Sequence, residues 1–302
     1  MFNMPFEKWR NEHPAGEPRV HSFRELLEMV QNQSIRKATA DKKKVLLLAI
    51  DMQNDFMDGG ALGVPGARKD AERLNQFIYD HFEDITHIMV SIDTHKPRQI
   101  FHPCWWEDSR GNEPEPLTII HDEDVEQGRW KPRYFAEESK RYVRKLEETS
   151  KKQLCIWPYH CLQGTYGHAL ESQFAAMAYL HSVLREYDLK TVVKGEDPLS
   201  EMYGIIEPEY SEKDLTRRDV INEVKQYDEI IIAGEAASHC VLESVNQLCS
   251  HLENKGDLLE HTYILTDCMS SIPGFEEDTE KAYRNLERTY GIKRITSAQW
   301  GK

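Results

Sequence analysis

The 302-residue sequence contains no apolar run that approaches the roughly 18 residues needed for a membrane-spanning helix. It also lacks a net positive charge. Its formal net charge is −14 at pH 7, and the resulting field opposes binding to nucleic acid or to an anionic membrane. The first ten residues lack the apolar core and cleavage pattern of a signal peptide. We therefore expect a soluble, cytoplasmic protein that binds neither nucleic acid nor a membrane.

Cysteine is scarce as well. The six cysteines are irregularly spaced, so the sequence favours reduced thiols over a disulfide framework. No internal repeat and no low-complexity segment is present. A chain of this length suits one large α/β domain or two small ones, with enough residues for a buried core.

From residue 44 onward, apolar runs that predict strands alternate with segments of helical periodicity. The run over 44–50 is continuously apolar, as is typical of a central strand buried on both faces. Further strands are expected at 87–92, 188–194, 229–234, 261–266 and 292–296. This alternation predicts a three-layer α/β/α domain over residues 44–302, with a mostly parallel, Rossmann-like central sheet.

Two segments depart from the alternating pattern. Residues 1–43 form a polar N-terminal extension, whose amphipathic stretch at 21–30 is expected to pack on the main domain or on a neighbouring subunit. Residues 104–152 form a long insertion that includes a basic, aromatic stretch at 128–135. Insertions of this length are usually functional or disordered. We interpret this one as a lid near an active site, and the alternative is a surface appendage used in oligomerisation.

Polar residues follow directly after four of the predicted strands. They are Asp51, Asp93, Lys194 and Cys240, and Cys240 lies at a turn that leads from a strand into a helix. In open α/β sheets, ligands bind beyond the carboxyl ends of the strands. Each residue also has an ordinary interpretation as a helix cap, a loop acid, a lysine extending to solvent or a buried cysteine. Their shared position at one sheet edge favours a functional site.

Histidines near two of these strand ends suggest a metal site. The Asp93-Thr-His95 motif can place a carboxylate and an imidazole on the same side of an extended segment. Both are suitable ligands for zinc, iron or manganese. His102 and His160 are further candidate ligands. A structural zinc site at Cys155, His160 and Cys161 is a weaker alternative, because its spacing matches no common zinc knuckle.

Five motifs occur in the order found in the isochorismatase-like cysteine hydrolases, and within them the sequence resembles the nicotinamidases. The resemblance covers residues 44–297, apart from the insertion. The motifs are Asp51-Met-Gln-Asn-Asp-Phe56 with the glycine-rich 59–66, Asp93-Thr-His95, Trp157 to Gly167, Val193-Lys194-Gly195, and Gly234-Glu-Ala-Ala-Ser-His-Cys240-Val.

The resemblance implies a catalytic triad and an oxyanion hole. Cys240 corresponds to the nucleophile, Asp51 to its acid/base partner and Lys194 to the third triad member. The backbone N–H groups of Ala236 and Cys240 correspond to the oxyanion hole, next to an expected cis peptide bond between Glu235 and Ala236. The implied reaction is hydrolysis of a small amide, such as nicotinamide, through a thioester.

The resemblance also implies a metal centre and a ring-binding site. Asp93, His95 and His160 match the metal ligands of nicotinamidases, with His102 as a tentative further ligand. The expected cofactor is a divalent metal, with zinc preferred over iron or manganese. Phe56 and Trp157 match the aromatic positions that enclose the substrate ring. We also expect a homo-oligomer.

Two departures from the family pattern leave the substrate open. They are the segment after Lys194 and residues 235–239 before Cys240. Alternatives are therefore hydrolysis of an N-carbamoyl compound or an isochorismate-like substrate, or a non-catalytic binding protein on the same fold.

Overall fold

A six-stranded parallel sheet forms the centre of the computed structural model, which describes residues 5–12, 14–18, 22–30, 34–150 and 152–302. The strand order is β10-β9-β8-β1-β2-β7, and every neighbouring pair is parallel. The predicted parallel sheet is thus confirmed. The strands are β1 (Val45–Ile50), β2 (His87–Asp93), β7 (Lys190–Lys194), β8 (Glu229–Gly234), β9 (Thr262–Leu265) and β10 (Lys293–Ile295).

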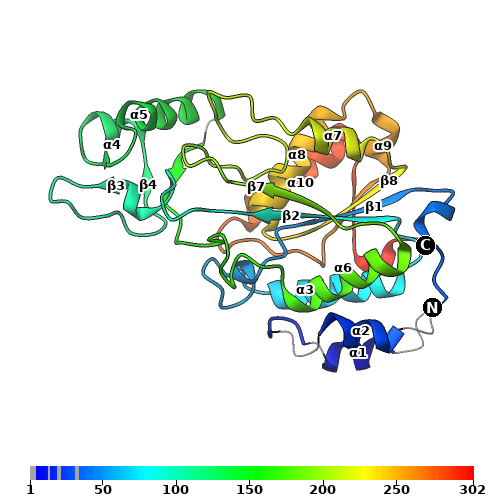
Figure 1. The fold of residues 1–302 in the computed structure, drawn as a ribbon. Coiled ribbons are helices and arrows are strands. Elements are labelled where there is room, and N and C mark those ends of the chain that lie inside the picture. The colour runs from blue at the N-terminus through cyan, green and yellow to red at the C-terminus, as the bar shows by residue number, and fades with distance from the viewer. Residues whose placement is uncertain (1–4, 13, 19–21, 31–33, 151) are drawn as a thin grey trace.

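Helices cover both faces of this sheet and complete the predicted three layers (Figure 1). One face carries α3 and α6, and the other carries α7, α8, α9 and α10. The helices are α3 (Ala67–Asp80), α6 (Ser172–Arg185), α7 (Arg218–Val224), α8 (Leu242–His251), α9 (Gly256–Glu260) and α10 (Glu276–Tyr290).

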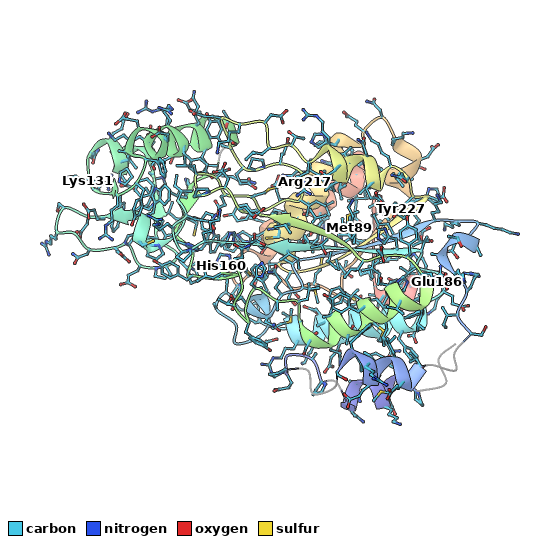
Figure 2. The ribbon with its side chains drawn as sticks, in the orientation of Figure 1. Met89, Lys131, His160, Glu186, Arg217 and Tyr227 are labelled. Atoms are coloured by element: carbon cyan, nitrogen blue, oxygen red, sulfur yellow. The ribbon has the colours of Figure 1, made fainter. Side chains whose placement is uncertain are left out.

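Strand β1 shows how the sequence specifies two cores. All six of its residues are buried. Alternate side chains point to opposite faces of a strand. Leu47 accordingly joins the core under α3 and α6, and Leu48 joins the core under α7 to α10. Met89 of β2 belongs to this second core and lies near the middle of the molecule, whereas Lys131 lies far out in the insertion (Figure 2).

The insertion forms a lobe at the carboxyl ends of the strands, on the opposite side of the molecule from both termini (Figure 1). It has its own apolar core, which includes Trp105, Trp106, Tyr142 and Leu154. The lobe's elements are β3 (Trp106–Glu107), β4 (Ile119–Ile120), α4 (Asp122–Glu126), β5 (Lys131–Pro132), α5 (Ala136–Lys145), a π-helical turn (Leu146–Ser150) and β6 (Leu154–Cys155).

The N-terminal extension packs on the main domain through two short helices, α1 (Phe6–Glu12) and α2 (Phe23–Val30) (Figure 1). Helix α2 is the predicted amphipathic stretch, of which His21 lies outside the described residues. Helix α1 is not predicted, because seven residues are too few for a clear apolar period. It is held by Phe6 and Trp9, which join the core around α3 and α6.

Two further expectations concern membrane-spanning helices and disulfide bonds. Within the described residues, no helix is long and apolar enough to cross a membrane. All six cysteines are free, in line with the irregular spacing that argued against a disulfide framework.

Gly234 ends β8 in a conformation that other residues rarely adopt. Its φ is +125°, and a Cβ atom added there would lie 2.0 Å from the carbonyl oxygen of Ile50. The next residue, Glu235, donates its N–H to that same oxygen at 2.9 Å. The close approach of β8 to the end of β1 therefore requires glycine, and it brings the segment after Gly234 next to Asp51.

Substitution of Gly234 tests this close approach. Gly274→Ala is the control, because Gly274 has a φ of +91° and no heavy atom lies within 4 Å of the added Cβ. We expect this variant to lower the free energy of unfolding only by the cost of the left-handed backbone, about 1 kcal/mol. Gly234→Ala should lose at least about 2 kcal/mol more, because the backbone of β1 must move. Urea denaturation measures both values, and equal losses would contradict the steric explanation.

Candidate active site

The four polar residues predicted at strand ends meet at the carboxyl edge of the sheet. Asp51 follows β1, Asp93 ends β2 and Lys194 ends β7. Cys240 lies in a π-helical turn (Ala237–Val241) between β8 and α8. The Lys194 Nζ atom is 2.9 Å from Asp51 Oδ2, 3.1 Å from Asp93 Oδ1 and 3.7 Å from Cys240 Sγ. One ammonium group therefore contacts the other three side chains.

Lys194 does not extend to solvent, so the alternative interpretation of this residue is wrong. Its side chain is fully buried, and its Nζ also donates to the carbonyl oxygen of Met202 at 3.1 Å. Burial alone would lower the pKa of Lys194. The carboxylates of Asp51 and Asp93 outweigh this effect and hold the pKa well above its ordinary value. The residue is a fixed cation.

Asp51 is held in an unusual backbone conformation with a φ of 47°. Its N–H donates to Ser91 Oγ at 2.9 Å, and Ser91 Oγ donates back to Asp51 Oδ1 at 2.6 Å. Burial raises the pKa of Asp51, while Lys194 opposes the rise. A carboxylate with a raised pKa is a better proton acceptor, as a general base requires.

The Cys240 thiol is buried between these charges. Burial raises the pKa of Cys240 well above its ordinary value; Lys194 opposes this, and Asp51 and Asp93 add to it. The side chain of Asp51 is a hydrogen-bond partner of the thiol. The resting sulfur therefore carries its proton, and Asp51 is the neighbouring group positioned to remove it.

Asp93, His95 and His160 form a group of three buried residues whose candidate ligand atoms lie within 4.8 Å of one another. The two histidines direct Nε2 toward Asp93 Oδ2, at 2.7 Å for His95 and 3.6 Å for His160. Their Nδ1 atoms face the carbonyl oxygens of Gly195 and Pro158, at 3.3 and 2.8 Å.

A carbonyl oxygen only accepts hydrogen bonds, so each Nδ1 of this pair donates to its backbone oxygen. A bound metal would use the Nε2 lone pairs, with each ring oriented by that backbone hydrogen bond. The donor set of two imidazoles and one carboxylate fits a divalent metal. Cys155 and Cys161 are not part of this group, so the described residues do not support the alternative of a structural zinc site formed by these two cysteines and His160.

His102 lies beside the group without belonging to it. Its ring centroid is 6.0 Å from that of His95 and 6.2 Å from that of His160. Its Nδ1 faces the carbonyl oxygen of Pro97 at 3.1 Å, and its Nε2 is buried without a hydrogen-bond partner. Burial lowers the pKa of His102 to about 3, so the ring is neutral.

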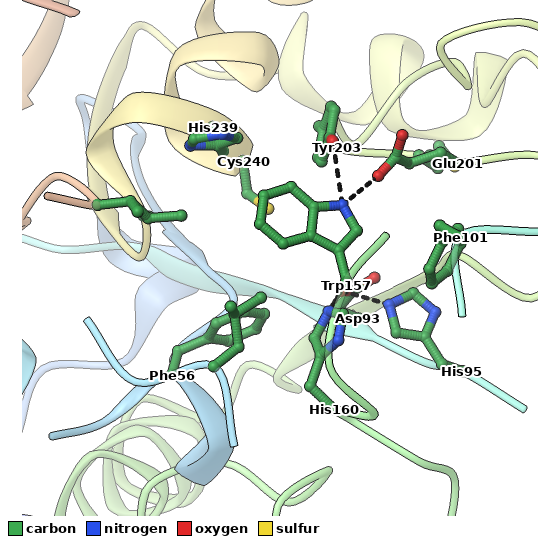
Figure 3. Close-up of a pocket in the computed structure, with 14 residues that line it drawn as sticks. Phe56, Asp93, His95, Phe101, Trp157, His160, Glu201, Tyr203, His239 and Cys240 are labelled. Carbon is green, nitrogen blue, oxygen red and sulfur yellow. Dashed lines mark hydrogen bonds and ion pairs between the residues drawn. The ribbon is translucent and has the colours of Figure 1, made fainter. Parts of the chain in front are cut away.

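A pocket opens between the thiol and the three-residue group (Figure 3). Its empty space, including the open mouth, is about 450 Å³. Phe56 and Trp157, the two aromatic residues expected near a substrate ring, both contribute to its wall. The other lining residues are Leu62, Asp93, His95, Phe101, His160, Glu201, Met202, Tyr203, Ala236, His239, Cys240 and Ile272.

Sequence reasoning missed the polar residues that hold Trp157. The indole Nε1 donates to Glu201 Oε1 at 2.5 Å and lies 3.2 Å from the hydroxyl of Tyr203 (Figure 3). Burial raises the pKa of Glu201 to about 8. Both residues come from the segment after Lys194, which is irregular and gives no periodic signal.

The turn between Gly234 and Cys240 contains the cis peptide bond that the family resemblance implied. The peptide bond between Glu235 and Ala236 is cis. Ala236 is buried and lines the pocket beside Cys240. The structure thus places both residues expected to form the oxyanion hole at the wall that faces the metal-ligand group.

No family model matches the chain. Among curated proteins, the chain is similar to the nicotinamidase of Escherichia coli K12, with 24% identity over 263 residues that cover 84% of this chain and 95% of the relative. It is also similar to the nicotinamidase of Saccharomyces cerevisiae, with 25% identity over 198 residues that cover 65% of this chain and 76% of the relative.

Solved structures of nicotinamidases and pyrazinamidases align with most of this chain. The yeast nicotinamidase bound to the inhibitor nicotinaldehyde aligns with a TM-score of 0.58 and 22% identity, over 83% of this chain and 99% of that one. An Acinetobacter baumanii nicotinamidase/pyrazinamidase aligns with a TM-score of 0.58 and 18% identity, over 85% and 98%. A Pyrococcus horikoshii pyrazinamidase in complex with zinc aligns with a TM-score of 0.50 and 22% identity, over 84% and 99%. The chain therefore has the isochorismatase-like hydrolase fold and, as its motifs predicted, is similar to nicotinamidases in both sequence and structure.

Proposed function

We propose that this protein is a cysteine-dependent amidohydrolase that converts nicotinamide, or a closely related aromatic amide, to the acid and ammonia. The contact of Lys194 with Asp51 and Cys240, in a pocket that also contains a metal-ligand group, carries the proposal. The similarity to curated nicotinamidases along most of the chain supports it. The nicotinaldehyde in the yeast neighbour indicates the kind of ring that such a pocket accepts.

Cys240 attacks the amide carbon in the first step. Asp51 removes the thiol proton as the C–S bond forms, because it is the hydrogen-bond partner of the thiol. Lys194 Nζ, 3.7 Å from the sulfur, stabilises the negative charge that develops there. Asp51 then passes the proton to the leaving nitrogen, and ammonia departs as the C–N bond breaks.

The tetrahedral intermediate places negative charge on the amide oxygen. We assign its stabilisation to the backbone N–H groups of Ala236 and Cys240, each contributing about 3 kcal/mol in comparable sites. A thioester on Cys240 remains after ammonia leaves. Water, deprotonated by Asp51, attacks the thioester carbon, the C–S bond breaks, Asp51 returns the proton to the Cys240 sulfur and the acid is released.

Asp93, His95 and His160 would hold the metal, and His102 would add a fourth ligand through its unpartnered Nε2. The bound ion supplies a Lewis-acidic anchor for a ring nitrogen, and zinc is the ion that we favour. Phe56 and Trp157 enclose the ring. The insertion acts as a lid over this pocket, since Trp157 belongs to the insertion's apolar core.

We also retain the expectations of a cytoplasmic location and of self-association. Six free cysteines fit a reducing compartment. Neither expectation affects the chemistry proposed above.

Ammonia release from a panel of small amides tests the reaction. The metal-loaded protein should hydrolyse nicotinamide, and Cys240→Ala should lower kcat at least about 10⁴-fold, because no nucleophile remains. Release of ammonia from N-carbamoyl compounds but not from nicotinamide would favour the alternative substrate class. No hydrolysis of any amide would leave the binding-protein alternative.

Metal affinity tests the ligand assignment separately. His160→Ala should weaken zinc binding at least about tenfold, because a ligand is lost. His168→Ala is the matched control, since this histidine contacts Thr94 Oγ1 at 2.9 Å and lies outside the ligand group. His102→Ala should also weaken binding; unchanged affinity would exclude His102 as a ligand. Competition with a chromophoric chelator measures all three affinities.

Glu201 tests the positioning of Trp157. Glu201→Ala removes the acceptor of the indole N–H, and we expect KM to rise about tenfold with a smaller change in kcat. Glu201→Gln keeps an acceptor oxygen and should restore KM to within about threefold. Equal KM values in both variants and the parent protein would contradict this role.

A further inference from the structure

The turn that carries Ala236 contains a carboxyl group for which the mechanism has no use. Glu235 is fully buried, and it belongs to the segment whose sequence departs from the family pattern. Its Oε2 accepts the backbone N–H of Ser270 at 3.3 Å. Its Oε1 is buried without an ordinary hydrogen-bond donor. A buried oxygen of this kind requires another partner.

That partner is a second carboxyl group, from Asp70 of α3. Asp70 is 2% exposed, and Ser270 brings the two acids together, because its backbone N–H donates to Glu235 and its hydroxyl donates to Asp70. The two side chains are hydrogen-bond partners of each other. Both carboxyl oxygens of Asp70 also accept other hydrogen bonds, since Ser270 Oγ donates to Oδ2 at 2.5 Å and Arg73 donates to Oδ1 at 3.1 Å.

Two carboxylates in a dry contact repel each other, so the pair is stable only when one of them keeps a proton. Burial raises the pKa of Asp70 as well, but the hydrogen bond from Ser270 and the charge of Arg73 oppose the rise, whereas Glu235 has no such cation or hydroxyl donor among its contacts. The proton is therefore assigned to Glu235. A protonated carboxyl group is a hydrogen-bond donor, and this explains why Glu235 Oε1 has no donor among the neighbouring groups.

We propose that Glu235 is held as a neutral acid that donates a hydrogen bond to Asp70, and that this bond positions the turn bearing the Ala236 N–H. The backbone of the turn is tied to neighbouring segments by Gly234 N–H to Cys268 O at 3.1 Å, Glu235 N–H to Ile50 O at 2.9 Å and Ala237 N–H to Ser270 O at 2.8 Å. The side chain of Glu235 adds a tie to α3. Its effect on catalysis rests on the proposed function, whereas its protonation does not.

The charged groups that act on Glu235 are Asp70 from α3 and Asp58 from the preceding loop, and Arg73 of α3 contacts Asp70. Ser270, in the loop after β9, contributes a backbone N–H. Burial raises the pKa of Glu235 well above its ordinary value, and Asp70 raises it further. An acid with a raised pKa in the folded state binds a proton that the unfolded chain releases above a pH of about 4.3. This group's contribution to stability therefore falls as pH rises.

Thermal unfolding between pH 5 and pH 9 tests the protonation state. Glu235→Gln keeps an N–H donor for Asp70 but has no proton to lose. We expect its Tm relative to the parent protein to increase steadily with pH. Glu72→Gln, which removes a partly exposed carboxylate from the same helix, should keep a constant difference in Tm. A pH-independent difference for Glu235→Gln would overturn the neutral-acid assignment.

Kinetics test the positioning role. Glu235→Ala should lower kcat about tenfold or more with little change in KM, because a misplaced oxyanion donor acts on the transition state. Glu235→Gln should restore most of that loss. Asp70→Ala removes the acceptor and should reproduce the loss of kcat, which keeps the test valid if Glu235→Ala does not fold. Unchanged kcat in a folded Glu235→Ala or Asp70→Ala variant would overturn the positioning role.

Failure of the parent protein to hydrolyse any amide would refute the proposed function, while the unfolding experiment would still decide the protonation of Glu235.

Discussion

The site depends on one buried ammonium group. Lys194 is the cation that contacts Asp51, Asp93 and Cys240 at the same time, so it joins the proposed nucleophile to the candidate metal ligands. Removing it would leave two buried carboxylates facing each other, a change that costs about 3–5 kcal/mol in comparable buried pairs. Parallel strands make this arrangement possible, because the ends of β1, β2 and β7 deliver the three charged side chains to one point.

Much of this arrangement could be predicted from the sequence because it follows from strand ends. A continuous apolar run such as 44–50 indicates a buried strand, and the residue after it must lie at the carboxyl edge of a parallel sheet. That reasoning brought Asp51, Asp93, Lys194 and Cys240 together. The motifs of a known family added Trp157 and grouped His160 with Asp93 and His95, links that no periodicity could provide. The cis peptide bond before Ala236 was likewise expected only from that resemblance.

The residues that sequence reasoning missed have roles that only tertiary contacts reveal. Glu201 follows an irregular segment, and its bond to the indole of Trp157 joins residues 44 positions apart in the chain. Glu235 and Asp70 are ordinary acids in the sequence, and their pairing depends on how α3 packs beside β8. Burial and its effects on pKa arise from such packing, so local sequence patterns carry no record of them.

The apolar core of the insertion also forms part of the pocket wall. Trp157 and Phe101 belong to both. The hydroxyl oxygen of Tyr142 in α5 also accepts a hydrogen bond from the backbone N–H of Glu201 at 3.0 Å, which ties the lobe to a second part of the pocket wall. The lobe and the pocket therefore share side chains, so local unfolding of the lobe would also disrupt the pocket wall. A variant of this chain without the lobe would have to build the same wall from other residues.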